Sequence, residues 1–151
     1  MENEEFKVID SGMVPRMAAL YRSAFAGDPW NDDWSDDIQL TEYIKEISGS
    51  YNALNYGLFK DGRLVAMSIG MIRHWWEGTN YNIEEFCVLP DMQGSGVGSR
   101  LMSLIEKDIK SRGLAGIFLQ TDNDKPSYKF YQKNGFNELS AHVSFYKNVR
   151  E

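Results

Sequence analysis

Hydrophobic residues change their spacing several times along the chain, and each change predicts a new element. Phe6 to Ile9 has the pattern of a short strand. Over residues 12–25 the apolar positions recur at helical spacing, with Pro15 in the first turn, where its missing N–H does no harm. Ser35 is suited to cap a second helix, and the two aspartates that follow it favour the positive end of the helix dipole. The apolar helical positions are Met13, Met17, Leu20, Tyr21 and Ala24 in the first helix and Ile38, Tyr43, Ile44 and Ile47 in the second.

Three strands are predicted in the middle of the chain. Residues 56–60 and 64–73 flank Asp61-Gly62, a pair that is typical of tight hairpin turns. A third strand is expected over residues 81–89. Because successive short connections join neighbouring strands, we expect an antiparallel meander.

The second half of the chain alternates between strand and helix patterns. The clearest helix begins at Val97 and ends near Gly113, and a buried strand is expected at residues 117–120. A strand, a long helix and a strand in succession predict a right-handed crossover between adjacent parallel strands. A short helix is expected at 127–133, and the segments 137–139 and 142–147 have the pattern of a closing hairpin.

Composition narrows the class of protein. The chain has 151 residues, 42% of them apolar, which fits one globular domain. With 22 acids against 16 bases and a net charge of −6, it lacks the basic surface on which nucleic acids and anionic membranes are bound. We therefore expect neither as a partner, whereas cationic partners are favoured.

Cysteine and histidine usage excludes two further kinds of site. The single cysteine, Cys87, cannot form an intramolecular disulfide, and His74 and His142 do not have the spacing of a structural zinc site. We expect no metal. The amino terminus is acidic rather than basic and apolar, and no apolar run approaches the roughly 18 residues of a membrane span. These features predict a cytoplasmic protein.

Residues 90–99, Pro-Asp-Met-Gln-Gly-Ser-Gly-Val-Gly-Ser, form a glycine-rich segment between a predicted strand and the long helix. Glycines allow the backbone to turn its N–H groups inward, and the helix terminus adds a positive dipole end, so such a segment suits phosphate. A P-loop is excluded because Gly98 is followed by Ser99 and Arg100 instead of lysine and a hydroxyl residue. The spacing of a dinucleotide fingerprint also fails, because Ser99 and Leu101 stand where glycine is required.

The same segment matches Gln-x-x-Gly-x-Gly from Gln93 to Gly98, after a strand that ends Cys-Val-Leu-Pro. Further on, residues 130–136 read Phe-Tyr-Gln-Lys-Asn-Gly-Phe. Together these two motifs, within Glu84 to Phe136, resemble the GNAT acetyltransferase superfamily. The resemblance implies a GNAT-like α/β domain over residues 1–151. Its mixed sheet would have six to seven mostly antiparallel strands with a central parallel pair, and about four helices would flank it.

The resemblance also implies acetyl-CoA as the acetyl donor. The backbone that would hold its pyrophosphate comprises Gln93, Gly94, Ser95, Gly96, Val97, Gly98 and Ser99. The pantetheine arm would lie between strands near Val88 and Ile117, and the Val88 N–H would meet the thioester oxygen. A further cofactor contact falls at Asn123 or Asp124, because aspartate stands where the family usually has asparagine.

Acetyl transfer to an amine needs a proton acceptor and a proton for the leaving thiolate. Tyr131 matches the family's general-acid tyrosine, although a packing role on a short helix is the alternative. The candidates for the base are Glu84 and Glu85, which strand alternation would send to opposite faces. The family's polyamine acetyltransferases align their base with Glu84, so both carboxylates stay candidates. Cys87 has no neighbouring histidine in sequence that would activate it as a nucleophile.

The acceptor is expected to contact the acidic, tryptophan-rich segment 28–37, where we predict that Trp30, Asp32 and Asp33 bind substrate. Carboxylates and aromatic rings attract ammonium groups. The alternative is a capped, solvated turn.

The sequence as a whole predicts an N-acetyltransferase that acts on a primary amine by direct attack in a ternary complex. A small cationic acceptor resembling a polyamine or an aminoglycoside is favoured, and acetylation of a protein or peptide amine is an alternative. A non-catalytic acyl-CoA-binding module is the rival function. A homodimer is compatible with the sequence.

Overall fold

A computed structural model describes residues 3–151. By its internal contacts the chain divides into two compact units, one that extends to Gln120 and one that comprises Thr121–Glu151. The first unit contains a single sheet, and the second contains one helix and no strand.

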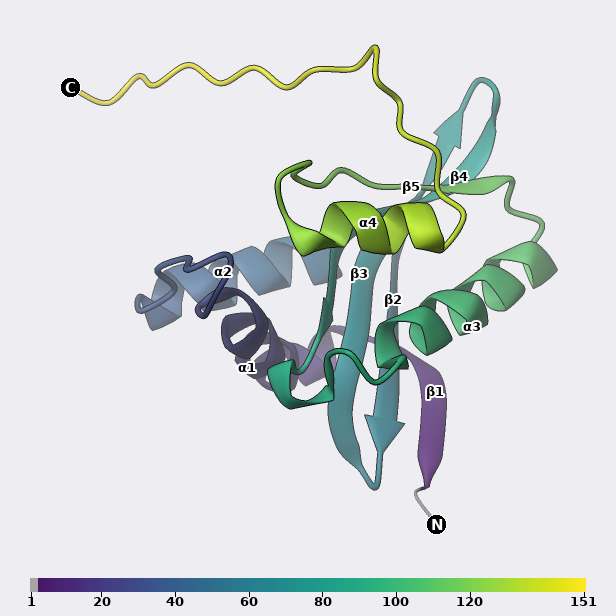
Figure 1. The fold of residues 1–151 in the computed structure, drawn as a ribbon, viewed down its shortest axis with the longest axis horizontal. Coiled ribbons are helices and arrows are strands. Elements are labelled where there is room, and N and C mark those ends of the chain that lie inside the picture. The colour runs from purple at the N-terminus through teal and green to yellow at the C-terminus, as the bar shows by residue number, and fades with distance from the viewer. Residues whose placement is uncertain (1–2) are drawn as a thin grey trace. The chain divides into compact units, whose positions relative to one another are not determined.

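The sheet of the first unit has five strands in the order β1-β2-β3-β4-β5 (Figure 1). The strands are β1 (Glu4–Ile9), β2 (Ala53–Lys60), β3 (Arg63–Trp75), β4 (Gly78–Val88) and β5 (Gly116–Phe118). The first four run antiparallel to their neighbours, whereas β5 pairs parallel with β4. The predicted meander and the parallel crossover pair are therefore confirmed.

The turn between β2 and β3 has the conformation that its sequence predicts. Asp61 and Gly62 have φ angles of 50° and 81°. Positive φ at both central residues gives a turn whose twist matches that of the flanking strands, and Asp-Gly adopts it readily. The turn therefore sets the register of β2 against β3 at this end of the hairpin.

Two expectations about the sheet are wrong. It has five strands within residues 3–151 rather than six or seven, and the parallel pair lies at its edge rather than at its centre. Both differences arise because residues 137–151 form no strand in the expected closing hairpin, and Val143 and Phe145 are exposed there. A β pattern becomes a strand only when a partner takes up its backbone hydrogen bonds, and residues 137–151 have none of the ladder pairing that defines one.

Helices cover both faces of the sheet in the first unit. These helices are α1 (Val14–Phe25), α2 (Asp37–Ser48) and α3 (Val97–Ser111). In Figure 1, α1 and α2 lie on one side of β2 and β3, and α3 lies on the other. Two adjacent β2 residues show the alternation directly: Asn55 donates to Ser48 O of α2 at 2.9 Å, and the Tyr56 hydroxyl donates to Asp108 of α3 at 2.6 Å. No helix within residues 3–151 is long and apolar enough to cross a membrane.

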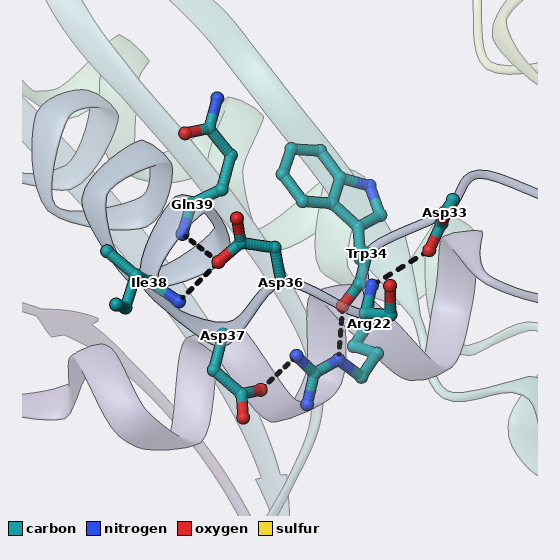
Figure 2. A network of polar contacts seen from close by, with 8 residues as sticks. Arg22, Asp33, Trp34, Asp36, Asp37, Ile38 and Gln39 are labelled. Carbon is teal, nitrogen blue, oxygen red and sulfur yellow. Dashed lines mark hydrogen bonds and ion pairs between the residues drawn. The ribbon is translucent and has the colours of Figure 1, made fainter.

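The starts of the first two helices differ slightly from expectation. A 3-10 turn, η1 (Ser11–Met13), precedes α1, and Asp10 accepts a hydrogen bond from the Gly12 N–H at its start. Asp36, not Ser35, caps α2, because its carboxylate accepts from the N–H groups of Ile38 and Gln39 at 3.0 and 3.1 Å (Figure 2). A charged cap also interacts favourably with the helix dipole, which explains why aspartate takes this position.

The second unit contains α4 (Pro126–Lys133), which begins with proline in its first turn, as expected for a residue without an N–H. Just before the helix, the Thr121 and Ser127 hydroxyls lie 2.7 Å apart. The Tyr131 ring meets Phe130 and Phe136 edge-on, at centroid distances of 5.3 and 5.5 Å. The predicted short helix is therefore confirmed.

Candidate active site

The glycine-rich segment connects β4 to α3 through a short 3-10 turn, η2 (Pro90–Met92). Gly94 and Gly96 have φ angles of 79° and 86°, in the left-handed region that other residues rarely adopt. A Cβ atom built on either glycine would meet no atom within 4 Å. The side of the loop toward which a side chain would point is therefore open space, so a ligand can approach the backbone there.

The N-terminus of α3 supplies the donors of this loop. Gly96 is the N-cap, no described side chain caps the helix, and the first intrahelical bond joins the Arg100 N–H to Gly96 O at 2.9 Å. The N–H groups of Val97 and Gly98 therefore belong to a first turn that offers them no intrahelical acceptor. With the positive end of the helix dipole behind them, these donors suit a phosphate group.

The polar side chains of the loop shape it from within. Gln93 donates from Nε2 to Val88 O at 3.2 Å, and the Ser95 hydroxyl donates to Met92 O. We expected both residues to contact a cofactor through the backbone, and their side-chain bonds leave that backbone role open. The Gln93 bond joins the loop to the end of β4, and the Ser95 bond lies within the loop, so both hold the loop in position next to the strand.

The backbone N–H of Val88 points to the edge of β4 opposite to β3. The next residue, Leu89, donates its N–H to Val65 O at 2.8 Å. Because successive N–H groups of a strand point to opposite edges, the Val88 N–H points away from β3. On that edge β5 pairs only with Asn80 to Asn82. The parallel pair thus ends well before Val88, as the expected role of this amide requires.

A β-bulge interrupts β4 at Glu84. Gly70 pairs with Ile83 and Ile69 pairs with Glu85, so Glu84 has no partner in the ladder. Glycine is required at position 70, because a Cβ there would lie 2.4 Å from Asn82 O. The strict alternation from which we expected the two glutamates on opposite faces is therefore broken between them.

The two glutamates nevertheless have different surroundings. Glu84 is exposed, whereas Glu85 is largely buried, and its Oε2 atom has no hydrogen-bond partner in the described chain. Burial raises the pKa of Glu85 from 4.5 to about 7, against the opposing effect of a hydrogen bond from Tyr21. The negative charges of Glu84 and Asp32 add to the rise. A carboxyl group with this pKa exchanges a proton readily near neutral pH.

Tyr21 of α1 and Tyr43 of α2 lie near Glu85, and Trp34 from the segment between the helices packs against both rings. Sequence reasoning included Trp34 in the tryptophan-rich segment but missed the two tyrosines as site residues. Tyr21 lies 5.3 Å from Trp34 and 5.7 Å from Tyr43 between ring centroids, and Trp34 stacks on Tyr43 at 5.5 Å. Burial, followed by the charge of Glu85, raises the pKa of both tyrosines. Their spacing in the sequence predicts Tyr21 and Tyr43 only as apolar positions of their helices. The sequence feature that could have indicated a site is the hydroxyl group of each tyrosine, because a buried tyrosine hydroxyl needs a polar partner.

Cys87 follows two residues later on β4 and is buried. Burial raises the pKa of its thiol well above the ordinary value, and the charge of Glu85 adds to the rise. A thiol in such surroundings stays protonated and is a poor nucleophile. This agrees with the expectation that Cys87 does not carry the acyl group.

Comparison with known proteins decides the family. A profile of the Acetyltransferase (GNAT) family matches residues 14–136, which is most of the chain. The chain belongs to the GNAT acetyltransferase family. The resemblance inferred from the two motifs is thereby confirmed.

The curated relatives that this GNAT protein matches carry the name of one protein acceptor. The [ribosomal protein bS18]-alanine N-acetyltransferase of Escherichia coli strain K12 is 29% identical over 94 residues. Those residues are 62% of this chain and 61% of that protein, so the chain matches less than two thirds of its curated relative.

Solved structures share the GNAT fold over nearly the whole chain. Aminoglycoside N-acetyltransferase AAC(6′)-Iy in complex with CoA has a TM-score of 0.73 at 19% identity and covers 99% of this chain and 97% of its own. A possible acetyltransferase from Clostridium difficile 630 has a TM-score of 0.79 at 14% identity, with 97% and 99% covered. At these identities the likeness shows the fold alone, which confirms the mixed α/β class.

Most carboxylates of the acidic segment of this GNAT protein are committed to local structure. Asp28 accepts from Asn31 Nδ2 at 2.8 Å, and Asp33 accepts from the Ser35 N–H at 3.1 Å. Asp37 forms an ion pair with Arg22, as Figure 2 shows. Of the expected substrate-binding residues, Asp33 thus also shapes a turn, and Trp30 packs edge-on against Phe25 at 5.3 Å.

Asp32 has a different place in this segment. Its charge raises the pKa of both Glu85 and Tyr21, so it lies near these two residues. Of the three residues expected to bind substrate, it is the one whose charge acts on the candidate base.

The remaining candidates lie in the second unit. Tyr131 lies on α4, and Asn123 and Asp124 precede that helix. Asp124 forms an ion pair with Lys125 at 3.2 Å, whereas Asn123 is exposed. The first unit therefore brings together the glutamates, Val88 and the glycine loop, and the second unit carries the expected acid and the Asn123–Asp124 pair. Within residues 3–151 no group of three or more histidine, cysteine, aspartate or glutamate residues could hold a metal ion.

Proposed function

We propose that this GNAT family member is an acetyl-CoA-dependent N-acetyltransferase that acts on a primary amine, with residues 1–151 as one acetyltransferase domain. The observation that carries the proposal is the continuous stretch from Glu84 to Ser99. Along it follow a carboxyl group with a pKa of about 7, an amide directed away from the ladder, and a glycine loop that leads into the N-terminus of α3, which no described side chain caps. A proton acceptor, an oxyanion donor and an anion site are the parts that acetyl transfer requires.

In this proposal the acetyl-CoA pyrophosphate binds the backbone of residues 93–99, and the Val88 N–H donates to the thioester oxygen. Glu85 accepts a proton from the ammonium group, and the free amine attacks the acetyl carbon. The C–N bond forms, the C–S bond breaks, and Tyr131 donates a proton to the departing CoA thiolate. The attacking nitrogen loses its surplus proton as the amide forms, and this proton restores the Tyr131 hydroxyl. Asn123 or Asp124 is a further cofactor contact. We favour Glu85 over Glu84 as the base because Glu85 is buried near the tyrosine rings.

The acceptor is proposed to be cationic. Asp32 and Glu84 place negative charge near Glu85, and Tyr21, Trp34 and Tyr43 offer aromatic faces, which attract ammonium groups. One relative's name gives a ribosomal-protein alanine as its acceptor, and a structural neighbour is an aminoglycoside N-acetyltransferase. We favour a small cationic amine and take a peptide amine as the second candidate.

The rival is an acyl-CoA-binding module without turnover. It would need the loop but not a carboxyl group whose pKa is about 7. A buried carboxylate with an unpartnered oxygen costs stability, and such a cost is typical of functional sites.

Release of the CoA thiol from acetyl-CoA, measured with amino sugars, polyamines and peptides, tests the proposal. We expect amine-dependent thiol release that weakens below pH 7, when Glu85 becomes protonated. The Glu85→Gln variant should lose this pH dependence, so the ratio of the two rates isolates Glu85 from the titration of the amine itself. Binding of acetyl-CoA without thiol release for any amine would favour the module.

A further inference from the structure

Two buried polar atoms lack a hydrogen-bond partner in the part of the chain that the structure describes, and both border the same aromatic cluster. They are Trp34 Nε1 and Glu85 Oε2. Buried polar atoms are almost always paired, so each exception calls for an explanation. One atom is a donor and the other an acceptor, yet they do not form a hydrogen bond with each other.

Arg22 holds the backbone of Trp34 in place. Arg22 donates from Nε to Trp34 O at 2.9 Å, and its guanidinium also pairs with Asp37 (Figure 2). The indole ring stacks on Tyr43 at an interplanar angle of 18° and meets Tyr21 at 76°. Contacts on three sides therefore fix the direction of the indole N–H.

The chemistry of the two atoms specifies a ligand. A carboxylate oxygen accepts, which suits an ammonium N–H, whereas an indole N–H only donates and therefore needs a lone pair, such as that of a hydroxyl or carbonyl oxygen. A purely apolar ligand would leave both the indole N–H and the carboxylate oxygen without a hydrogen-bond partner. A molecule with an amine and an oxygen close to it would satisfy both.

We propose that Trp34 is a specificity-determining residue that donates a hydrogen bond from Nε1 to an oxygen of the acceptor while Glu85 engages its amine. The inference rests on the proposed acetyltransferase function and narrows its substrate class. Amines that carry a nearby oxygen, such as amino sugars and peptide amino termini, are favoured. Polyamines, whose heteroatoms are all protonated nitrogens, are disfavoured because they leave the indole N–H unpaired.

Matched substrate pairs test this class in the wild-type protein, without any variant. In 2-aminoethanol and propylamine, a hydroxyl replaces a methyl group at similar size, and glucosamine and cyclohexylamine extend the comparison to rings. A lost hydrogen bond changes kcat/KM by about tenfold. Because a nearby oxygen also lowers the pKa of an amine, kcat/KM is expressed per concentration of the unprotonated amine. On that scale we expect each oxygen-bearing amine to exceed its partner by about that factor. An alanine-terminated peptide and spermidine complete the panel and separate sugar from peptide as the source of the oxygen.

The Trp34→Phe variant removes the N–H and keeps an aromatic ring. It should reduce the preference to within about threefold, because kcat/KM falls more for the oxygen-bearing amine, which loses a hydrogen bond, than for propylamine, which loses only part of an aromatic face. CoA affinity should stay unchanged. Trp76→Phe, in the exposed β3–β4 turn, is the matched control and should keep the full preference.

The outcomes separate this inference from the function on which it rests. If none of the amines supports thiol release, the proposed function is overturned, and the inference with it. Equal kcat/KM values for both members of each pair, per concentration of the unprotonated amine, would overturn the inference alone. The same holds if Trp34→Phe, folded as judged by its thermal melt, keeps the wild-type preference.

Discussion

Replacing Glu85 with glutamine should stabilise the protein at pH 8 while it impairs catalysis. Burial, with smaller contributions from nearby charges, raises the pKa of this carboxyl group to about 7 from an ordinary value of 4.5. The folded protein therefore binds its proton more tightly than the unfolded chain does. The stability of the folded protein falls as the pH rises from about 4.5 to 7, because ionising Glu85 costs more free energy in the folded protein than in the unfolded chain. Glutamine resembles the neutral acid and removes this cost.

The size of the effect follows from the two pKa values. A rise from 4.5 to about 7 corresponds to about 3 kcal/mol of unfolding free energy, fully lost above pH 7. In a protein of this length 1 kcal/mol shifts Tm by about 2–4 °C. We therefore expect Glu85→Gln to raise Tm by roughly 6–12 °C at pH 8, and to change it little at pH 5, where the folded wild type is already protonated. The rate of acetylation at pH 8 should fall about 10²-fold or more.

Thermal melts and urea titrations at pH 5 and pH 8 measure this gain. Glu84→Gln is the matched control, because it removes the same charge from the neighbouring exposed position. We expect no comparable pH-dependent gain from the control. Equal destabilisation by Glu85→Gln at both pH values would show that Glu85 is not a carboxyl group held at a cost, and our reasoning about the base would fail with it.

Three further predictions concern the other candidate residues. Gly96→Asp should weaken CoA binding at least about tenfold more than Gly96→Asn, because both strain the backbone equally but only aspartate repels phosphate; calorimetry that gave equal affinities would argue against the loop as the anion site. Tyr131→Phe should lower kcat about 10²-fold with CoA binding intact, whereas Tyr128→Phe on the same helix should not, and equal kcat values would return Tyr131 to a packing role. Asp32→Asn should raise KM for a cationic amine at low salt more than Asp33→Asn does, and a KM insensitive to both would make the segment a structural turn.

Local signals account for the parts of the site that the sequence predicts well. The glycine loop can be inferred because positive φ at Gly94 and Gly96 is a property of single residues, and helix α3 because its apolar spacing is regular over four turns. The Asp61-Gly62 turn fixes the β2–β3 hairpin for the same reason. Each of these features depends on residues close together in the chain.

The parts that sequence reasoning misses depend on distant contacts. The expected hairpin over residues 137–147 has the right alternation, but alternation does not supply a partner strand. The aromatic cluster joins Tyr21, Trp34 and Tyr43 from two helices and the segment between them, and nothing in their spacing indicates that a carboxylate from β4 lies among them. The cap at Asp36 instead of Ser35 is a smaller difference, because both residues are good caps and one position separates them.

The β-bulge determines which of two adjacent carboxylates reaches the aromatic rings. Up to the pair Gly70–Ile83 the ladder between β3 and β4 is regular, and the next regular pair would join Ile69 to Glu84. A register slip of one residue sends each later side chain of a strand to the opposite face. The extra residue places Glu85 opposite Ile69 instead, on the face that α1 and α2 cover, and leaves Glu84 exposed. The same slip sets the direction of the Val88 N–H three residues later, so one inserted residue, made possible by the absence of a side chain at Gly70, positions both the proposed base and the proposed oxyanion donor.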